Sequence, residues 1–212
     1  MTSEPLYQQD PHDLCTHRAP EECVACEISG SLMCRFDTGD MVSFFLGFLP
    51  FGIAVVAGMI RSGYGWWLVG WLPIWFFFFF VVEGRVLCSH CPFWAEWSRV
   101  LHCHANYGVI KLWQFRPGPM SRLEKALFGA GAAVFGFYPI IFMILGGQWV
   151  LLAIAVTGAA SAAVNLRRNV CVRCINFSCP VNAVPKSLVD AYLRRNPVMG
   201  EAWEASGYRL GE

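Results

Sequence analysis

Charged residues are scarce in this sequence, and long stretches have none at all. Asp, Glu, Lys and Arg make up only 15% of its 212 residues, whereas they make up about 25% of a typical soluble domain. No charged residue occurs in 41–60, 62–82 or 126–166. A chain of this length also lacks the polar material to cover such long apolar segments within a soluble core. The absence of charge therefore predicts a membrane protein.

The uncharged stretches are long enough for four membrane-spanning helices, because each helix needs about 20 apolar residues. We predict spans at 42–60, 65–82, 126–145 and 149–166. Gly146-Gly147-Gln148 is the expected turn between the last two spans. Glu83 and Asn165, at the ends of two spans, are interpreted as ordinary polar boundary residues, with the lining of an interfacial pocket as the alternative.

Other absences exclude classes of function. No Asp, Glu, Lys, Arg or His lies inside a predicted span, which disfavours an ion path, a pump and a transmembrane haem held by paired histidines. The sequence has no phosphate-binding glycine loop, no nucleophile elbow and no His-Glu-x-x-His motif. No basic region followed by a short apolar core begins the chain, so we expect no secretory signal peptide. We expect no nucleic-acid partner.

Lys and Arg are distributed unevenly around the predicted spans. Residues 83–125 hold six of them and the tail after Leu166 holds seven, but the two turns on the opposite side hold only Arg61. The positive-inside rule places the basic segments in the cytoplasm. With four spans, both termini lie on that side. We therefore predict a multi-pass protein of the inner (cytoplasmic) membrane with cytoplasmic termini, surrounded by membrane lipid.

The second half of the sequence repeats the plan of the first half. In each half a hydrophobic hairpin is followed by an arginine, Arg85 or Arg168, three residues before a Cys-x-x-Cys pair. The predicted fold class is an all-α integral membrane protein, with four transmembrane helices arranged as two pseudo-symmetric hairpins and a cysteine-rich cytoplasmic cap. We divide the chain into a cytoplasmic Cys-rich segment (1–40), a first transmembrane hairpin (41–82), a cytoplasmic Cys/His loop (83–125), a second transmembrane hairpin (126–166) and a cytoplasmic Cys-rich tail (167–212).

All ten cysteines lie outside the predicted spans. The cytoplasm keeps thiols reduced, so the Cys-x-x-Cys pairs favour metal binding or redox chemistry over structural disulfides. The cysteines form three groups: Cys15, Cys23, Cys26 and Cys34; Cys88, Cys91 and Cys103; and Cys171, Cys174 and Cys179. Histidines close to them are further candidate ligands: His12 and His17 in the first group, and His90, His102 and His104 in the second.

The sequence leaves the grouping of these ligands open. The first group alone has four thiols, enough for one tetrahedral zinc or one cubane cluster. In the rest, Cys88 and Cys91 face Cys171 and Cys174 in one four-thiolate site, or each group holds its own cluster. In the second arrangement the fourth ligand comes from the other half of the chain or from one of the three histidines of the second group. The predicted cofactors are one to three [4Fe–4S] clusters, with zinc as the alternative.

Proline directly follows a cysteine twice, at Cys91-Pro92 and Cys179-Pro180, which is typical of bacterial ferredoxin motifs. The tail string CVRCINFSCPVNAV resembles the end of such a motif. GRVLCSHCPF, placed after a membrane hairpin, resembles the matching stretch of the membrane-bound ferredoxin-like proteins that feed electrons to anaerobic respiratory reductases. The resemblance implies cytoplasmic [4Fe–4S] clusters on a helical membrane anchor. Their implied ligands are Cys88, Cys91, Cys171, Cys174 and Cys179.

Three functions agree with this sequence. The first is an integral-membrane iron–sulfur protein that relays electrons at the cytoplasmic face, between a soluble redox protein and either quinone or a partner membrane subunit. The second is a zinc-stabilised membrane scaffold, in which metal folds segments too short to have a core of their own. The third is a membrane thiol–disulfide oxidoreductase coupled to quinone, which resembles the membrane disulfide-forming enzymes in its four spans and its cysteine pairs.

Two local patterns outside the spans also carry structural predictions. Ser121-Arg-Leu-Glu124 fits a capping box directly before the third span. After Pro185, the residues Leu188, Val189, Tyr192 and Leu193 form an apolar stripe on one face of a helix. Such a stripe docks onto its own protein, onto the membrane or onto a partner subunit.

A thiol reagent that cannot cross membranes tests the predicted topology. An impermeant maleimide added to intact cells should leave all ten cysteines unlabelled, because the topology places them inside. A Gln148→Cys variant, with its thiol at the opposite turn, should be labelled and serves as the positive control. Mass spectrometry of the purified protein gives the result. Labelling of native cysteines would contradict the topology and favour the thiol–disulfide enzyme.

Overall fold

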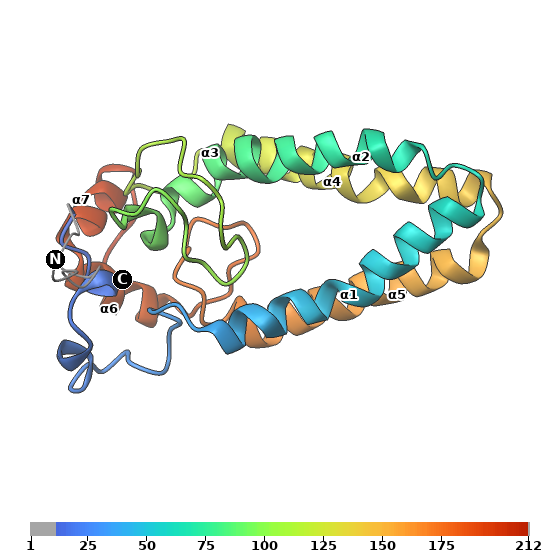
Figure 1. Cartoon of the computed structure of the whole chain (residues 1–212). Coiled ribbons are helices and arrows are strands. Elements are labelled where there is room, and N and C mark those ends of the chain that lie inside the picture. Colours follow the sequence, from blue (N-terminus) through green and yellow to red (C-terminus); the bar gives the residue numbers. More distant parts are fainter. Residues whose placement is uncertain (1–11, 212) are drawn as a thin grey trace, which may run out of the picture.

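A computed structural model describes residues 12–211 of the chain (Figure 1). Residues 1–11 of the predicted segment 1–40, and Glu212 of the tail, lie outside the described residues. Within 12–211 the regular structure is entirely helical. Two isolated bridges, Ser29–Leu32 and Val100–Ile110, are the only β-type pairings there. The all-helical part of the predicted fold class is therefore confirmed.

Four helical runs are long and apolar enough to cross a membrane, which confirms the four predicted spans. The first run is α1 (Thr38–Arg61) and the third is α4 (Arg122–Leu145). The second run consists of α2 (Trp67–Phe76), the π-helical segment η4 (Phe77–Glu83), α3 (Gly84–Val86) and the short turn η5 (Cys88–His90). The fourth run consists of α5 (Trp149–Asn165) and the π-helical segment η7 (Leu166–Val170). The second run extends past the predicted end at residue 82 and reaches His90.

Most apolar side chains of these helices point away from the protein. On α1, Phe45, Leu49 and Ile53 remain 51%, 51% and 60% exposed. Apolar surface left in water costs about 25 cal/mol for each Å², and soluble monomers rarely carry a continuous apolar band of this extent. Lipid is the solvent that suits this surface, so the structure is that of a multi-pass membrane protein.

The four runs form two pairs, in which α1 packs along α5 and α2 packs along α4 (Figure 1). The pairs meet at the end where the two short turns lie and separate toward the opposite end. At the meeting point, Gln148 Nε2 donates a hydrogen bond to the Arg61 carbonyl oxygen over 3.5 Å. Gly147 has a φ of +64°, a conformation that glycine adopts without strain. The predicted turn at 146–148 is confirmed.

Small residues allow the paired helices to approach closely. A Cβ atom on Gly158 of α5 would lie 3.1 Å from the backbone nitrogen of Phe51 in α1. A Cβ atom on Gly131 of α4 would lie 2.6 Å from the ring of Phe78 in η4. Since lipid supplies no hydrophobic force between helices, such close van der Waals contact is what holds them together.

The predicted capping box at the start of α4 is confirmed. The Ser121 hydroxyl accepts a hydrogen bond from the Glu124 amide over 3.3 Å, and the Glu124 carboxylate accepts one from the Ser121 amide over 2.9 Å. Together they satisfy two backbone donors that the first turn of a helix leaves free. The box defines where the chain enters the third span.

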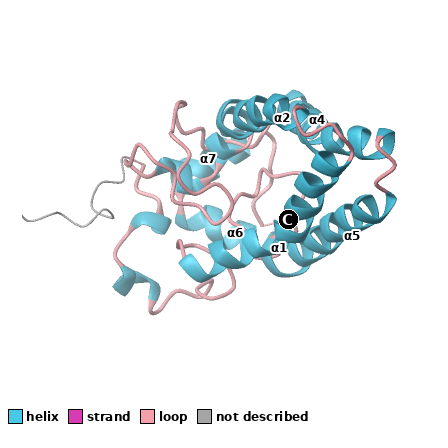
Figure 2. Ribbon diagram, turned by 45° about the vertical axis from the view of Figure 1, so that its right-hand side comes forward, coloured by secondary structure: helices cyan, strands magenta, loops and turns pink. Residues whose placement is uncertain are grey.

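The rest of the described chain forms one region at the open end of the helix pairs, which we call the head (residues 12–37, 87–121 and 171–211). Loops dominate it (Figure 2). Its regular elements are the short turns η2 (Cys15–His17), η3 (Pro20–Cys23), η5 and η6 (Pro92–Ala95) and the helices α6 (Lys186–Arg195) and α7 (Pro197–Ala205). The predicted stripe on α6 buries Val189, Tyr192 and Leu193 in the core of the head, beside Cys88 and Cys91. The stripe therefore docks onto its own protein.

A bulky residue at Gly158 should separate α1 from α5. We expect Gly158→Leu to lower the free energy of unfolding by about 1–3 kcal/mol, because the added side chain meets the α1 backbone. Unfolding in mixed micelles with increasing denaturing detergent, followed by circular dichroism, measures the change. Gly136→Leu on α4 is the matched control, because a Cβ there meets no atom within 4 Å. Equal stability of the two variants would contradict the packing of this helix pair.

Candidate functional site

The fold sorts the ten cysteines into two groups rather than three. Cys15, Cys23, Cys26 and Cys34 surround one cavity in the head, and we call them the N-terminal centre. The second and third groups of the sequence come together as one core centre, which contains Cys88, Cys91, Cys103, Cys171, Cys174 and Cys179. None of the ten forms a disulfide.

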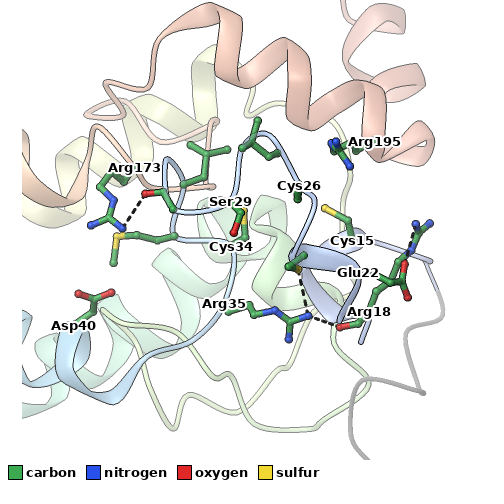
Figure 3. Close-up of a pocket in the computed structure, with 15 residues that line it drawn as sticks. Cys15, Arg18, Glu22, Cys26, Ser29, Cys34, Arg35, Asp40, Arg173 and Arg195 are labelled. Carbon is green, nitrogen blue, oxygen red and sulfur yellow. Dashed lines mark hydrogen bonds and ion pairs between the residues drawn. The ribbon is translucent and has the colours of Figure 1, made fainter. Parts of the chain in front are cut away.

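The N-terminal centre lines a cavity of about 240 Å³. Four arginines share the lining: Arg18, Arg35, Arg173 and Arg195. Figure 3 shows Arg173 on one side of the cavity, Arg35 below it, and Arg18 and Arg195 on the other side. Glu22 and Asp40 also line the cavity, and Arg18 and Arg195 form ion pairs with Glu22 and Glu27. Arg35 and Arg173 are therefore the guanidinium groups that would compensate the negative charge of metal-bound thiolates.

Hydrogen bonds from the protein hold two of these four sulfurs. Asn196 Nδ2 donates to Cys15 Sγ over 3.3 Å, while its Oδ1 accepts from the Cys15 amide over 2.7 Å. The Arg35 guanidinium donates to Cys23 Sγ over 3.6 Å and to the Arg18 carbonyl oxygen. These bonds fix the thiols toward the cavity.

Burial and crowding keep the Cys15 and Cys34 thiols of the N-terminal centre protonated when no cation is bound. Burial, followed by the nearby thiols of Cys15, Cys26 and Cys23, raises the pKa of Cys34 to about 12. Burial likewise raises the pKa of Cys15. Four thiolates this close repel one another, so a positively charged metal or cluster is needed to deprotonate them together.

The core centre is assembled from three separate segments of the chain. Cys88 and Cys91 follow α3 and are only 5% exposed each. Cys103 lies in the loop that follows, within electrostatic reach of both. The tail contributes Cys174, whose pKa is raised to about 12, chiefly by burial and to a smaller extent by the thiols of Cys103, Cys179 and Cys171. Burial, followed by the thiols of Cys103 and Cys174, also raises the pKa of Cys91.

Backbone amides point at the sulfurs of the core centre. The amide of Phe93 donates to Cys91, and that of Asn176 donates to Cys174. Cys103 receives hydrogen bonds from the amides of His104, Ala105 and Asn106, and Cys179 from those of Val181 and Asn182. Amide donors stabilise sulfur in its anionic, metal-bound form and tune the reduction potential of iron–sulfur sites.

Polar side chains fasten the tail loop to the first cysteine loop. Asn176 Nδ2 donates to the Leu87 carbonyl oxygen over 3.3 Å, and the Met120 amide donates to Ser178 Oγ over 3.3 Å. Asn182 Nδ2 donates to the Cys174 carbonyl oxygen over 2.8 Å. The first two bonds join loops of the core centre across 89 and 58 residues of sequence, and the third holds the tail loop in shape.

The two centres adjoin each other. The Met33 amide donates to the Arg173 carbonyl oxygen over 2.8 Å, and the Arg173 guanidinium donates to the Gly30 carbonyl oxygen over 3.3 Å. Cys34 and Cys174 each follow one partner of the first bond. With standard backbone dimensions, that bond places their Cα atoms at most about 12 Å apart.

Tyr192 lies between the two centres. It is 0% exposed, and its hydroxyl shares a hydrogen bond of 2.6 Å with Thr16 Oγ1. Burial raises the pKa of Tyr192, and thiols from both centres, Cys15 and Cys34 on one side and Cys91 on the other, raise it further. The buried face of α6 is therefore the wall that the two centres share.

The structure gives the candidate histidine ligands partners other than the thiols. His90 Nδ1 donates to the Gly118 carbonyl oxygen over 2.6 Å, His102 Nδ1 lies 2.9 Å from the Glu96 carboxylate, and His104 Nε2 accepts from the Asp37 amide over 3.1 Å. His17 Nε2 bonds the Pro92 carbonyl oxygen, and His12 packs against the Phe115 ring. The sequence alone did not show whether these histidines bind a metal or hydrogen-bond to the protein.

The spacing of the thiols can be compared with the spacing that a single metal ion requires. A single Zn²⁺ needs its sulfurs about 2.3 Å away, and among residues 12–211 no three Cys, His, Asp or Glu side chains converge closely enough to hold one ion. The cavity of about 240 Å³ is also far larger than the roughly 10–15 Å³ that holds one water. As the side chains lie, the thiols therefore form no closed site for a single ion among the described residues, and the cavity beside the N-terminal four is larger than one ion needs.

Sequence reasoning missed one residue of the core centre. Glu83 is not an ordinary boundary residue, because it is only 8% exposed and lies within electrostatic reach of the thiols of Cys88, Cys103 and Cys179. The available signal was a carboxylate at the end of an uninterrupted apolar run, five residues before a Cys-x-x-Cys pair. Asn165 differs, since its exposed side chain bonds Asn169 on the surface.

Removing the side chain of Asn196 should loosen the N-terminal centre. We expect Asn196→Ala to cost about 1–3 kcal/mol, because it leaves the Cys15 amide without its acceptor. Limited trypsin digestion should then cleave faster after Arg18 and Arg35. Asn169→Ala, which removes an exposed amide bond, should digest like the unmodified protein. Unchanged digestion of Asn196→Ala would show that other contacts hold the segment.

Comparison with known proteins identifies no relative for this chain: no family model, curated protein or solved structure matches it. The chemistry of the two centres is therefore argued from their own side chains. Those side chains are thiols with amide donors and arginines around them, placed at one end of four membrane helices.

Proposed function

We propose that this protein is an integral-membrane iron–sulfur protein that relays electrons between a soluble redox partner and either quinone or a partner enzyme in the membrane. In this proposal the N-terminal centre and the core centre each hold a [4Fe–4S] cluster. Bound clusters would supply one-electron redox chemistry, while the protein supplies the thiolates, the amide donors and the distance between the clusters.

The observation that carries this proposal is the sorting of all ten cysteines into two adjoining groups of four and six. Each group has at least the four thiolates that a cubane cluster needs. The rate of electron tunnelling falls steeply with distance. Cys34 of one centre and Cys174 of the other each follow a partner of the Met33–Arg173 hydrogen bond, so clusters bound there would be close enough to exchange electrons. A metal that only stabilises the fold does not require a second metal centre close to the first.

The two centres differ in burial, and an electron relay between water and the membrane needs one exposed centre and one buried centre. The N-terminal centre has partly exposed cysteines, among them Cys23 and Cys26, which suits a soluble partner. The core centre contains two buried cysteines, Cys88 and Cys91, beside four partly exposed ones, and it is built on the ends of two membrane helices, where Cys171 directly follows η7. Electrons would thus pass between the water-facing centre and the membrane-facing one.

The packing of the helices supports the pseudo-symmetric arrangement of the hairpins. Exchange of the two hairpins converts α1 into α4 and α2 into α5, and the observed pairs, α1 with α5 and α4 with α2, map onto each other. Both second helices also end in a π-helical segment before their Cys-x-x-Cys pair, η4 before Cys88 and η7 before Cys171. In this proposal a duplicated hairpin brings the two pairs to one membrane face.

The distribution of charge supports a cytoplasmic head in the inner membrane. Arg61 lies at the turn end of the helices, and the other Lys and Arg residues of the chain lie in the head or at the helix ends beside it. A positive membrane face is the cytoplasmic one. That compartment also keeps free thiols available for clusters.

Metal analysis of protein purified without oxygen tests the proposed function. We expect about eight iron and about eight sulfide per chain, with the broad visible absorption of [4Fe–4S] clusters. Cys26→Ser leaves three thiols in the N-terminal centre and should lose its cluster. The triple variant Cys88→Ser, Cys91→Ser and Cys103→Ser leaves three thiols in the core centre and should lose the core cluster, so each variant should keep about four iron. Because every cysteine belongs to one of the two groups, each variant is the control for the other.

Zinc in place of iron, with no visible absorption, would rule out the relay and leave a zinc-stabilised scaffold. Loss of all iron from both variants would contradict two separate centres. Circular dichroism of each variant confirms that its helices remain folded.

A further inference from the structure

The Glu83 carboxyl is a buried polar group without an adequate partner. Its side chain is 8% exposed, and its Oε2 atom is buried and makes no hydrogen bond. It forms no ion pair with any residue in 12–211, where the structure describes the chain. Burying a carboxyl in this way is costly unless something else binds it.

The local fold directs this carboxyl into the head. Glu83 ends η4, in which the preceding residues, Phe77 to Val82, are all apolar. A π-helical turn contains one more residue than an α-helical turn, so it changes which side chains point inward. Such turns are frequent at functional sites. Here the turn places the one polar side chain of an apolar segment at the core centre.

The groups around Glu83 are those of the core centre. Asn106 bonds the Glu83 side chain, and its Nδ2 also donates to Cys88 Sγ over 3.3 Å. The thiols of Cys88, Cys103 and Cys179 are all within electrostatic reach of the carboxyl. The Glu83 carboxyl and these three thiols thus lie in one buried region of the head, spaced too widely for a single ion to contact them all but around the volume that the proposed cluster would occupy.

We propose that Glu83 Oε2 is a metal ligand of the core centre, so that this centre has mixed oxygen and sulfur ligation while the N-terminal centre has sulfur alone. This assignment rests on the proposed metal–sulfur function. A carboxylate is a harder ligand than a thiolate and suits soft, sulfur-bound metals less well. The metal that Glu83 binds is therefore the one that the core centre releases first on oxidation.

The competing interpretation is a neutral carboxylic acid that only packs against Asn106. Glu83→Gln separates the two, because glutamine has the same shape and can still bond Asn106 but is a far poorer metal ligand. Glu83→Cys adds a second test, because a thiolate restores ligation with a different donor atom. Glu96→Gln is the matched control: Glu96 is another largely buried carboxylate of the head, but its partners are His102 and Lys111.

The experiment uses full-length protein labelled with ⁵⁷Fe and purified without oxygen. Mössbauer spectroscopy and iron content are compared for the unmodified protein and the three variants. We expect the unmodified protein and Glu96→Gln to share an iron subsite with the isomer shift of oxygen ligation. Glu83→Gln should lose that subsite together with about one iron per chain, and Glu83→Cys should keep the iron with an all-sulfur spectrum.

Identical spectra and iron contents for Glu83→Gln and the unmodified protein would overturn the ligand assignment and leave the relay standing. Unmodified protein with zinc and no iron would overturn the relay instead. In that case the zinc contents of Glu83→Gln and the unmodified protein are compared, and equal contents would overturn the ligand assignment. Circular dichroism and elution volume confirm that each variant is folded.

Discussion

The four long helices cannot bury their apolar faces within this chain, and the rest of the structure depends on that constraint. Lipid must cover them, so their ends lie at the two faces of a membrane. The short turns hold one end of both pairs together, and the chain outside the helices gathers at the other end. Cys88 and Cys171 follow directly from two membrane helices, so their positions depend on helix packing in the bilayer.

The head has little regular structure to hold it in place. Its core is formed by α6, whose buried face carries Tyr192 and Asn196, and both residues bond the N-terminal segment. The remaining cohesion comes from side-chain bonds between loops, such as Asn176 to Leu87, and from the backbone bond between Met33 and Arg173. In small, loop-rich regions of this kind, metal binding commonly supplies part of the free energy of folding.

The same packing determines the chemistry of the thiols. Burial raises the pKa values of Cys34 and Cys174 to about 12, so both thiols are protonated at neutral pH. The amide donors around Cys103 and Cys179 offset part of the cost of forming thiolates. Arginines surround the N-terminal centre, whereas the core centre has the carboxyl of Glu83 among its thiols. The two centres therefore differ in their electrostatic surroundings as well as in their burial.

The sequence by itself determined the four spans, the turn at 146–148, the capping box of Ser121 and Glu124 and the buried stripe around Tyr192. Each of these depends on hydropathy or periodicity within a few helical turns, which neighbouring residues encode. Only the tertiary structure decided that the cysteines form groups of four and six, because segments from both halves of the chain meet there. It also decided that His90 bonds Gly118 and that Glu83 faces Cys103. Those partners are set by long-range packing and by a π-helical turn, and hydropathy and periodicity within a few helical turns specify neither.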